Sequence, residues 1–212
     1  MEATTRAAVA RRGRLLQYLT VLWNSAECIV ALAAGFLAGS IALVGFGFDS
    51  AIEVTSSLAA LWRLRSDAVE RDRERAEGRT LRIIGVCFML LAGYVLYDAI
   101  RTLLTREPPS VSTAGIIITG LSLIVMPILV GAKRRVAASL QSSALEAETR
   151  QTRVCAYLSG IVLGGLALNA AFGWWWADPV AGLAMTPLIA WEGWQALTGQ
   201  TCCWTPGIAD RR

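Results

Sequence analysis

The sequence has 212 residues, and 55% of them are hydrophobic. With a mean hydropathy of +0.50, the chain is too apolar for an ordinary soluble domain, which excludes proteins built around a large water-soluble core. The formal net charge of +4 could suggest a nucleic acid partner, but the basic residues are divided among several segments, so we expect none. The composition therefore predicts an all-α integral membrane protein.

Six apolar segments are long enough to cross a bilayer as helices. They span residues 14–37, 41–64, 80–104, 112–132, 143–172 and 178–198. Together they predict a single transmembrane domain over residues 14–198. Residues 1–13 are expected to form a basic N-terminal segment, and residues 199–212 a short tail.

Basic residues alternate between the connections of the predicted helices. Arginines precede the first helix and crowd the second connection, and Lys133, Arg134 and Arg135 lie in the fourth. The first and fifth connections contain no Lys or Arg, and the third has little beyond Arg106. Because basic connections stay in the cytoplasm, this alternation predicts cytoplasmic termini and an even number of spans. Acidic residues nearly cancel the arginines of the second connection, which favours a solvated loop over a basic binding patch.

The first predicted helix carries two polar residues in an apolar stretch, Asn24 and Glu27. They are three residues apart and share one face of the helix, which we expect to look into the bundle. They could support a site on the second predicted helix or pair with another helix, and the sequence favours neither.

The second predicted helix contains two carboxylates, Asp49 and Glu53, inside an otherwise apolar segment. Their i, i+4 spacing places them on one face. Asp49 lies about 12 Å along the helix from Ile41, which is near the middle of the membrane. A charge at this depth costs about 2.5–3.5 kcal/mol on insertion scales. Two on one face therefore require a counterion, shared protons or a bound cation.

The third, fourth and sixth predicted helices carry fewer polar groups. Asp98, near the outer end of the third, predicts a local ion pair with Arg101, and a role in guiding cations is the alternative. The fourth has almost no ionisable residue and is expected to pack against neighbours or face lipid. At the start of the sixth, Asp178 precedes Pro179, and we expect Asp178 to cap that helix.

The cysteines do not form a disulfide framework. Cys28, Cys87 and Cys155 lie in predicted helices, whereas Cys202 and Cys203 are adjacent on the predicted cytoplasmic tail, where thiols stay reduced. The tail pair could pass a soft metal to or from a pore, or be tolerated without a role. The sequence has no histidine, the commonest metal ligand.

A shift of 102 residues aligns the second predicted helix with the fifth. Asp49 then falls on Gln151 and Glu53 falls on Cys155, at the same i, i+4 spacing. Other matched pairs are Ser40 with Ser142, Ala42 with Ala144, Leu43 with Leu145, Ser50 with Thr152 and Ser57 with Ser159. Transporters are often built from repeats, with the substrate site between corresponding helices.

This internal repeat predicts a metal site made of Asp49, Glu53, Gln151 and Cys155. Oxygen and sulfur donors in four-coordinate geometry favour zinc. The soft thiolate also suits Cd²⁺, and Co²⁺ and Fe²⁺ are further alternatives. Glu148 competes as a ligand because it lies two turns before Cys155 on the same face. The structural alternatives are a packing role for Cys155, an interhelical hydrogen bond for Gln151 and a polar network around the carboxylates.

These motifs resemble those of the cation diffusion facilitator family of divalent-metal transporters. The second-helix motif of that family is similar to Ser40-Ile41-Ala42-Leu43 followed by Asp49-Ser50-x-x-Glu53. Its fifth-helix motif is similar to Ala144-Leu145-Glu146-Ala147-Glu148-x-x-Gln151-Thr152-x-x-Cys155, and the start of its sixth helix to Trp176-Ala177-Asp178-Pro179. The resemblance covers about residues 14–198 and is greatest to short bacterial members.

The resemblance implies a metal site between the second and fifth helices, a homodimer, and exchange of metal against protons. The chain departs from the family pattern in three ways. Gln151 and Cys155 stand where His and Asp are usual, the second connection has no His-rich loop, and the usual cytoplasmic metal-binding domain is not expected.

We therefore expect a protein of the bacterial inner membrane that exports a divalent metal, zinc first, by alternating access. It is expected to have no enzymatic activity and no resident cofactor. The alternatives are a membrane metal sensor or partner subunit without transport, and an exporter of organic cations.

Overall fold

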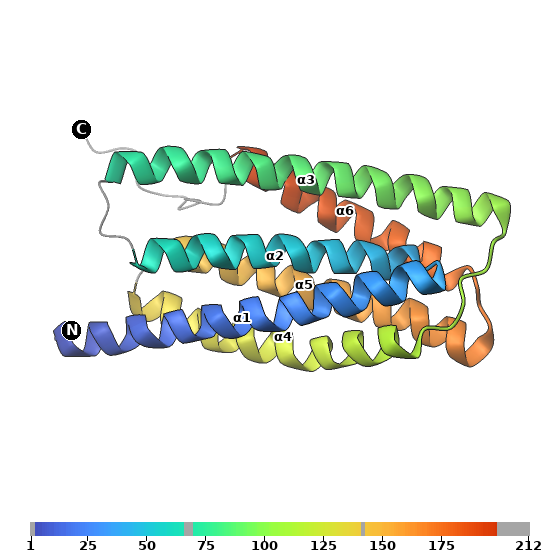
Figure 1. Cartoon of the computed structure of the whole chain (residues 1–212), viewed down its shortest axis with the longest axis horizontal. Coiled ribbons are helices and arrows are strands. Elements are labelled where there is room, and N and C mark those ends of the chain that lie inside the picture. The colour runs from blue at the N-terminus through green and yellow to red at the C-terminus, as the bar shows by residue number, and fades with distance from the viewer. Residues whose placement is uncertain (1–2, 66–69, 141–142, 199–212) are drawn as a thin grey trace, which may run out of the picture.

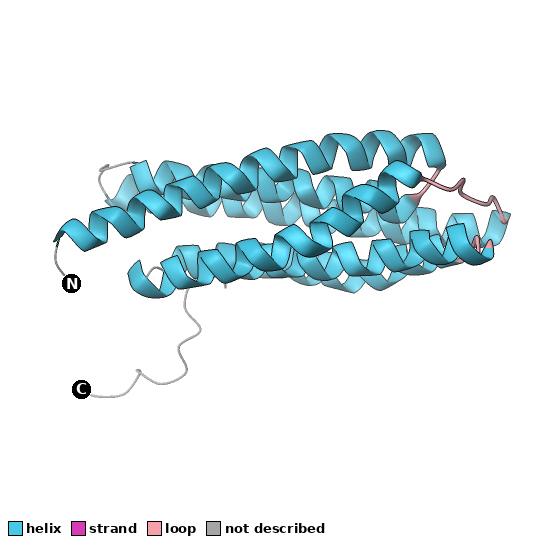
Figure 2. Cartoon of the chain, turned by 90° about the horizontal axis from the view of Figure 1, so that it is seen from below, coloured by secondary structure: helices cyan, strands magenta, loops and turns pink. Residues whose placement is uncertain are grey.

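The computed structural model describes residues 3–65, 70–140 and 143–198. These residues form six helices: α1 (Ala3–Ala38), α2 (Ile41–Arg65), α3 (Glu70–Thr105), α4 (Thr113–Leu140), α5 (Ser143–Phe172) and α6 (Ala177–Thr198). Successive helices run in opposite directions, which gives a long, narrow bundle (Figure 1, Figure 2). Since the described residues contain no strand, the prediction of an all-α chain is confirmed.

Three helices extend beyond the predicted apolar spans. α1 begins at residue 3 rather than 14, α3 begins at residue 70 rather than 80, and α4 ends at residue 140 rather than 132. The added turns are rich in Ala, Arg and Glu, which favour helix without being apolar. The basic residues 133–135 therefore belong to α4, and the prediction that they form a connection is wrong.

Five of the described helices contain a stretch that is long and apolar enough to cross a membrane. These stretches are Arg11–Ala38, Ile41–Leu58, Gly85–Thr105, Thr113–Ser139 and Thr149–Phe172. α6 is not among them, since its last turns carry Glu192, Gln195 and two tryptophans. It nevertheless packs along α3 within the bundle (Figure 1). Several apolar helices thus indicate a multi-pass membrane protein, and the crossing of α6 stays a prediction, as does the cytoplasmic position of the termini.

The six helices pack into one bundle in which α3 and α6 form a close pair. α1 packs against α2 and α4, α5 packs against α4, α6 and α2, and α3 packs chiefly against α6. Large, fully buried side chains fill the space between them, including Phe46, Phe88, Met126, Leu158 and Met185.

α2 is the central helix, because its first half is buried on every side. All residues from Ile41 to Gly47 are buried. α1 comes unusually close to this segment: a Cβ at Gly47 would stand 2.8 Å from Leu32 Cγ, and a Cβ at Gly35 would stand 2.8 Å from Val44 Cγ2. The segment that leads to Asp49 and Glu53 is therefore enclosed before the carboxylates begin.

The N-terminus of α2 is capped by a residue of α6. Asp178 Oδ1 accepts a hydrogen bond from the Ser40 hydroxyl at 2.5 Å, and Asp178 Oδ2 accepts one from the backbone N–H of Ile41 at 3.0 Å. The Ser40 Oγ in turn accepts a hydrogen bond from the N–H of Leu43 at 3.2 Å. Asp178 has no exposed surface. The prediction that Asp178 caps the sixth helix is therefore wrong, because both carboxylate oxygens point to α2.

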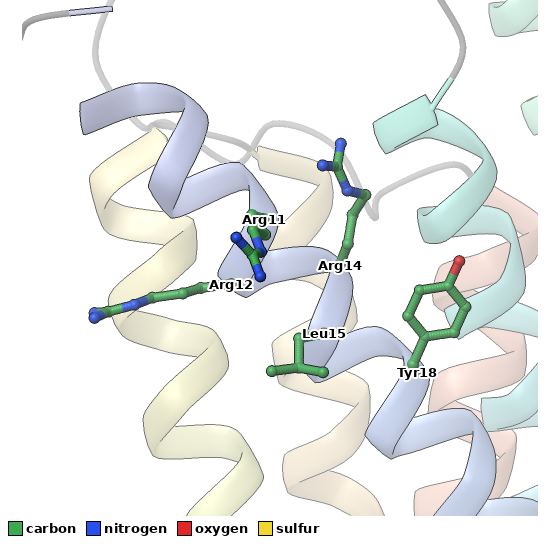
Figure 3. Close-up of a pocket in the computed structure, with 5 residues that line it drawn as sticks. All are labelled: Arg11, Arg12, Arg14, Leu15 and Tyr18. Carbon is green, nitrogen blue, oxygen red and sulfur yellow. The ribbon is translucent and has the colours of Figure 1, made fainter. Parts of the chain in front are cut away.

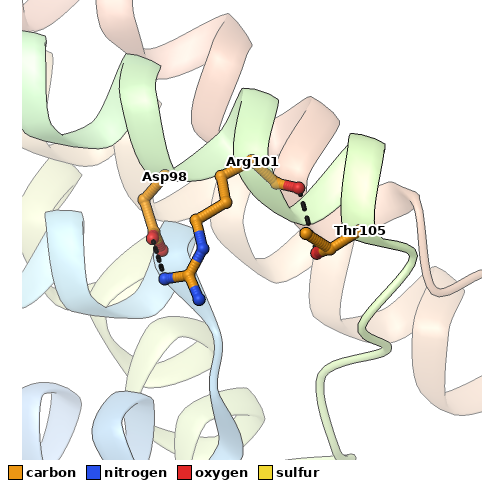
Figure 4. Close-up of polar contacts among 3 residues, drawn as sticks. All are labelled: Asp98, Arg101 and Thr105. Carbon is orange, nitrogen blue, oxygen red and sulfur yellow. Dashed lines mark hydrogen bonds and ion pairs between the residues drawn. The ribbon is translucent and has the colours of Figure 1, made fainter.

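The predicted ion pair near the C-terminal end of α3 is confirmed. Arg101 Nη1 lies 3.8 Å from Asp98 Oδ1, and the Thr105 hydroxyl donates to the Arg101 carbonyl at 3.0 Å (Figure 4). The Arg101 side chain is 56% exposed, so the pair is a local surface contact that contributes little to stability.

Candidate metal centre

The two carboxylates of α2 lie inside the bundle. Asp49 is 4% exposed and Glu53 is 1% exposed. They are one helical turn apart and interact electrostatically with each other. The burial expected from their shared face is therefore observed, and the cost of two like charges in one apolar interior requires compensation.

Cys155 of α5 meets this pair from the opposite side. Its side chain is 1% exposed, and its thiol is close enough to interact with both Asp49 and Glu53. Three of the four predicted ligands thus come together where α2 packs against α5. Gln151, one turn earlier on α5, is half-buried, and its Nε2 makes no hydrogen bond to the described part of the chain.

The side chains that meet here are not arranged around a metal position. Within residues 3–65, 70–140 and 143–198, no group of three or more His, Cys, Asp or Glu side chains has the geometry to hold a metal ion. The four-residue metal site therefore stays a prediction. Glu148, the competing ligand, lies in α5, but its side chain falls outside the described structure, as do Cys202 and Cys203.

Glu27 links α1 to the carboxylate-bearing part of α2. It has no exposed surface, and its Oε2 accepts a hydrogen bond from the Ser50 hydroxyl at 2.9 Å. Glu27 also interacts electrostatically with Asp49 and Glu53. Asn24, one turn earlier on α1, is likewise fully buried. Glu27 therefore pairs with another helix, and a supporting role for Asn24 and Glu27 at the metal site stays a prediction.

A corresponding contact joins α4 to α5 and was not predicted. The ammonium group of Lys133 donates to the Thr152 hydroxyl at 3.0 Å, and Lys133 is only 3% exposed. Thr152 is the residue that the 102-residue shift matches with Ser50. In each half, the hydroxyl residue after the first predicted ligand thus binds a charged side chain of the preceding helix, Glu27 in one half and Lys133 in the other. The only sequence signal for this role was the repeat itself.

A further carboxylate contributes to the negative field of the interior. Glu192 of α6 is half-buried and interacts electrostatically with Asp49 and Glu53, and with Arg150 of α5. Carboxylates from α1, α2 and α6 therefore act on one region, and a bound cation would compensate them.

A separate hollow lies near the beginning of α1. It has a volume of about 510 Å³ and is lined by Arg11, Arg12, Arg14, Leu15 and Tyr18 (Figure 3). Arg12 and Arg14 extend from the helix in different directions. None of the predicted ligands lines it, and Tyr18 precedes Glu27 by about 14 Å of helix, so this hollow is not part of the predicted metal centre.

Comparisons with known proteins identify relatives of this arrangement. Residues 18–198 match the model of the cation efflux transmembrane domain. The chain is 27% identical over 194 residues to an uncharacterized transporter from Synechocystis sp., covering 87% of the chain and 61% of that protein. It is 26% identical over 178 residues to a cation-efflux pump from Shewanella oneidensis, covering 79% of the chain and 57% of the pump.

A third relative is the cadmium, cobalt and zinc/H(+)-K(+) antiporter of Bacillus subtilis, which is 28% identical over 180 residues. That match covers 78% of the chain and 55% of the antiporter. The chain therefore matches only about three-fifths or less of the length of these curated relatives.

Proposed function

The chain belongs to the cation efflux family. From that membership we propose that it exports a divalent metal ion across the bacterial inner membrane, with zinc as the first candidate. The observation that carries the proposal is the meeting of Asp49, Glu53 and Cys155 inside the bundle, with no more than 4% of any of them exposed. A burial of two acids and a thiol is costly, and a divalent cation compensates it. The relative from Shewanella oneidensis is named a cation-efflux pump, and the one from Bacillus subtilis is named an antiporter of cadmium, cobalt and zinc.

The donor chemistry supports zinc as the first candidate. Carboxylate oxygen and thiolate sulfur are both common zinc ligands, and zinc accepts four ligands without a strong geometric preference from its d electrons. The thiolate also suits Cd²⁺, and Co²⁺ and Fe²⁺ follow as weaker candidates. Gln151 would supply a neutral amide oxygen as the fourth donor.

Alternating access is the transport mechanism that we propose for this bundle. The ligands come from α2 and α5, so a change in the angle between these helices opens or closes the set of donors. The Glu27–Ser50 and Lys133–Thr152 contacts tie each ligand helix to the helix that precedes it. We expect α1 to move with α2, and α4 with α5.

Proton exchange and a homodimer complete the proposal. Without histidine, a proton would compete with the metal at Asp49, Glu53 or the Cys155 thiol. Apolar side chains that are exposed on α1, α3 and α4, such as Leu37, Leu104 and Ile128, suit contact with lipid or with a second copy.

Uptake of metal into inside-out vesicles tests the proposal. Vesicles that contain the protein should take up ⁶⁵Zn²⁺, and Asp49→Ala should abolish the uptake. Asp98→Ala is the matched control, because it removes an acidic group that lies in a surface ion pair, and it should transport normally. Undiminished uptake by Asp49→Ala would refute the site.

Two other experimental outcomes would favour a different function for the protein. Zinc-dependent thermal stabilisation without flux would identify a membrane metal sensor or partner subunit. Uptake of bulky organic cations that is indifferent to zinc would identify an organic-cation exporter.

A further inference from the structure

A second polar cluster lies beside the predicted metal centre, between α1, α2 and α4. It consists of Glu27, Ser50 and Ser122, together with Asn24, which lies three residues before Glu27 on the same face of α1. None of the four has exposed surface. Ser122 of α4 and Ser50 of α2 both lie close enough to interact with the Glu27 carboxylate. Unlike the predicted metal centre, this cluster contains no sulfur.

The hydrogen bonds inside the cluster do not satisfy its polar atoms. The Ser50 hydroxyl lies 2.9 Å from Glu27 Oε2 and 3.1 Å from the Phe46 carbonyl. It carries one hydrogen, so it can donate to only one of these acceptors at a time. Ser50 therefore satisfies only part of the Glu27 carboxylate, which Ser122 and Trp23 also approach.

Four more atoms of the cluster have no hydrogen-bond partner among the described residues. They are Glu27 Oε1, Asn24 Oδ1, Asn24 Nδ2 and Ser122 Oγ. Buried polar side-chain atoms are normally paired, and each one left unpaired costs about 1–3 kcal/mol. A concentration of such atoms around a single carboxylate indicates that the cluster receives a ligand.

The donor set defines the chemistry of that ligand. A carboxylate, an amide carbonyl and a hydroxyl are hard oxygen donors, which prefer hard cations over soft ones. In its ionised form Glu27 supplies a single negative charge, which matches a monovalent ion. We propose that Glu27, Asn24 and Ser122 bind an alkali cation, Na⁺ or K⁺, at a site separate from the predicted divalent-metal centre.

The two sites are coupled by charge. Glu27 interacts electrostatically with Glu53 and Asp49, so a cation at Glu27 weakens the field that attracts a cation to those carboxylates. Coupling between two binding sites is reciprocal. An alkali ion therefore lowers the affinity for the divalent metal, and this consequence rests on the proposed function.

The binding site is tested first without any divalent metal. The purified full chain in lipid nanodiscs, with EDTA present, is titrated with NaCl or KCl against choline chloride at constant ionic strength and pH. Thermal stability should rise in a saturable way, as expected when an ion binds only the folded state. Glu27→Gln should weaken the apparent ion affinity by about tenfold or more, and Ser122→Ala should weaken it by a smaller factor.

Matched variants separate this site from the metal centre and from the surface. Glu107→Gln removes an exposed carboxylate, and Ser139→Ala removes an exposed hydroxyl of α4, so both should respond as the wild type does. Asp49→Asn should retain the alkali response. If Glu27→Gln does not fold, the comparison of Ser122→Ala with Ser139→Ala carries the test.

Three results would overturn the proposal. The first is the lack of a saturable response to Na⁺ and K⁺, which would mean that water satisfies the cluster. The second is an unchanged response in both Glu27→Gln and Ser122→Ala. The third is a loss in Asp49→Asn as large as that in Glu27→Gln, which would place the ion at the predicted metal centre.

Coupling is measured separately, by titrating Zn²⁺ in Na⁺ and in choline buffer. Zinc should bind more weakly in Na⁺, and Glu27→Gln should abolish the difference. An alkali response in a chain that binds no zinc would refute the proposed function and support the alkali site. Zinc binding that is indifferent to Na⁺ in the wild type would refute the coupling.

Discussion

Removal of the Asp178 side chain should destabilise the protein strongly, although Asp178 lies away from the predicted ligands. Its carboxylate accepts hydrogen bonds from the Ser40 hydroxyl and from the Ile41 N–H, and it has no exposed surface. A hydrogen bond to a charged group contributes about 1.5–3 kcal/mol. Asp178→Ala removes two such bonds and leaves two buried donors without acceptors, so we expect a loss of about 3 kcal/mol or more.

Ser40→Ala should cost less, because it leaves the Ile41 bond in place. It removes one bond to Asp178 and the acceptor of the Leu43 N–H, for a loss of about 2 kcal/mol. The double variant loses the shared bond only once. Its destabilisation should therefore be smaller than the sum of the single effects by about 1.5 kcal/mol.

The assay is unfolding in mixed micelles by titration with dodecyl sulfate, followed by circular dichroism. Asp98→Ala serves as the control, since a surface ion pair contributes about 1 kcal/mol or less. Additive effects of Asp178→Ala and Ser40→Ala would refute the shared bond. An Asp178→Ala protein as stable as the control would refute the capping of α2 from α6.

Three further changes test the packing and the predicted ligands. Cys155→Ser should reduce the affinity for Cd²⁺ more than that for Zn²⁺ in calorimetric titrations, because it replaces a soft donor by a hard one; equal losses would argue against thiolate ligation. Thr152→Val should destabilise the protein more than Lys133→Met, because Thr152→Val leaves the buried ammonium of Lys133 with one hydrogen bond fewer. A larger loss of stability in Lys133→Met, in the same unfolding assay, would contradict this reasoning. Gly47→Ala should lower the free energy of unfolding by about 1–3 kcal/mol, since the added Cβ would lie 2.8 Å from a side chain of α1. Gly120→Ala is the control: open space surrounds Gly120, so this change should stabilise the helix by about 0.5–1 kcal/mol. Similar effects of the two would refute the close approach of α1 to α2.

The apolar pattern predicted the helices but not their ends. Hydropathy reports where a helix meets lipid, so it identified six helices and stopped at the charged residues. The helices continue because Arg, Glu and Ala favour the same conformation in water. Because the predicted fourth helix ended at residue 132, Lys133 was expected in a connection. It is instead a buried residue of α4, and its ammonium group donates a hydrogen bond to α5.

The candidate site could be predicted from the sequence because of the 102-residue repeat. The match of Glu53 with Cys155 placed two side chains in corresponding positions, and the structure brings them together. For Asp178, no repeat match indicated which helix its side chain contacts. A carboxylate next to a helix start indicates a cap, but which helix it caps depends on the ends that meet in space. Ser122 likewise gave no signal, since a lone serine in an apolar helix is common.

The hydrogen bonds that Asp178 of α6 accepts from Ser40 and Ile41 fix the N-terminus of α2, so a tilt of this helix turns about that end. Asp178 holds the helix at Ile41, about 12 Å from Asp49 and about 18 Å from Glu53 along the axis. A tilt of about 5° around that point displaces Asp49 by about 1 Å and Glu53 by about 1.6 Å. The two carboxylates therefore travel unequal distances against α5 in any rocking motion, and a small rotation is enough to change which of them reaches a shared ion.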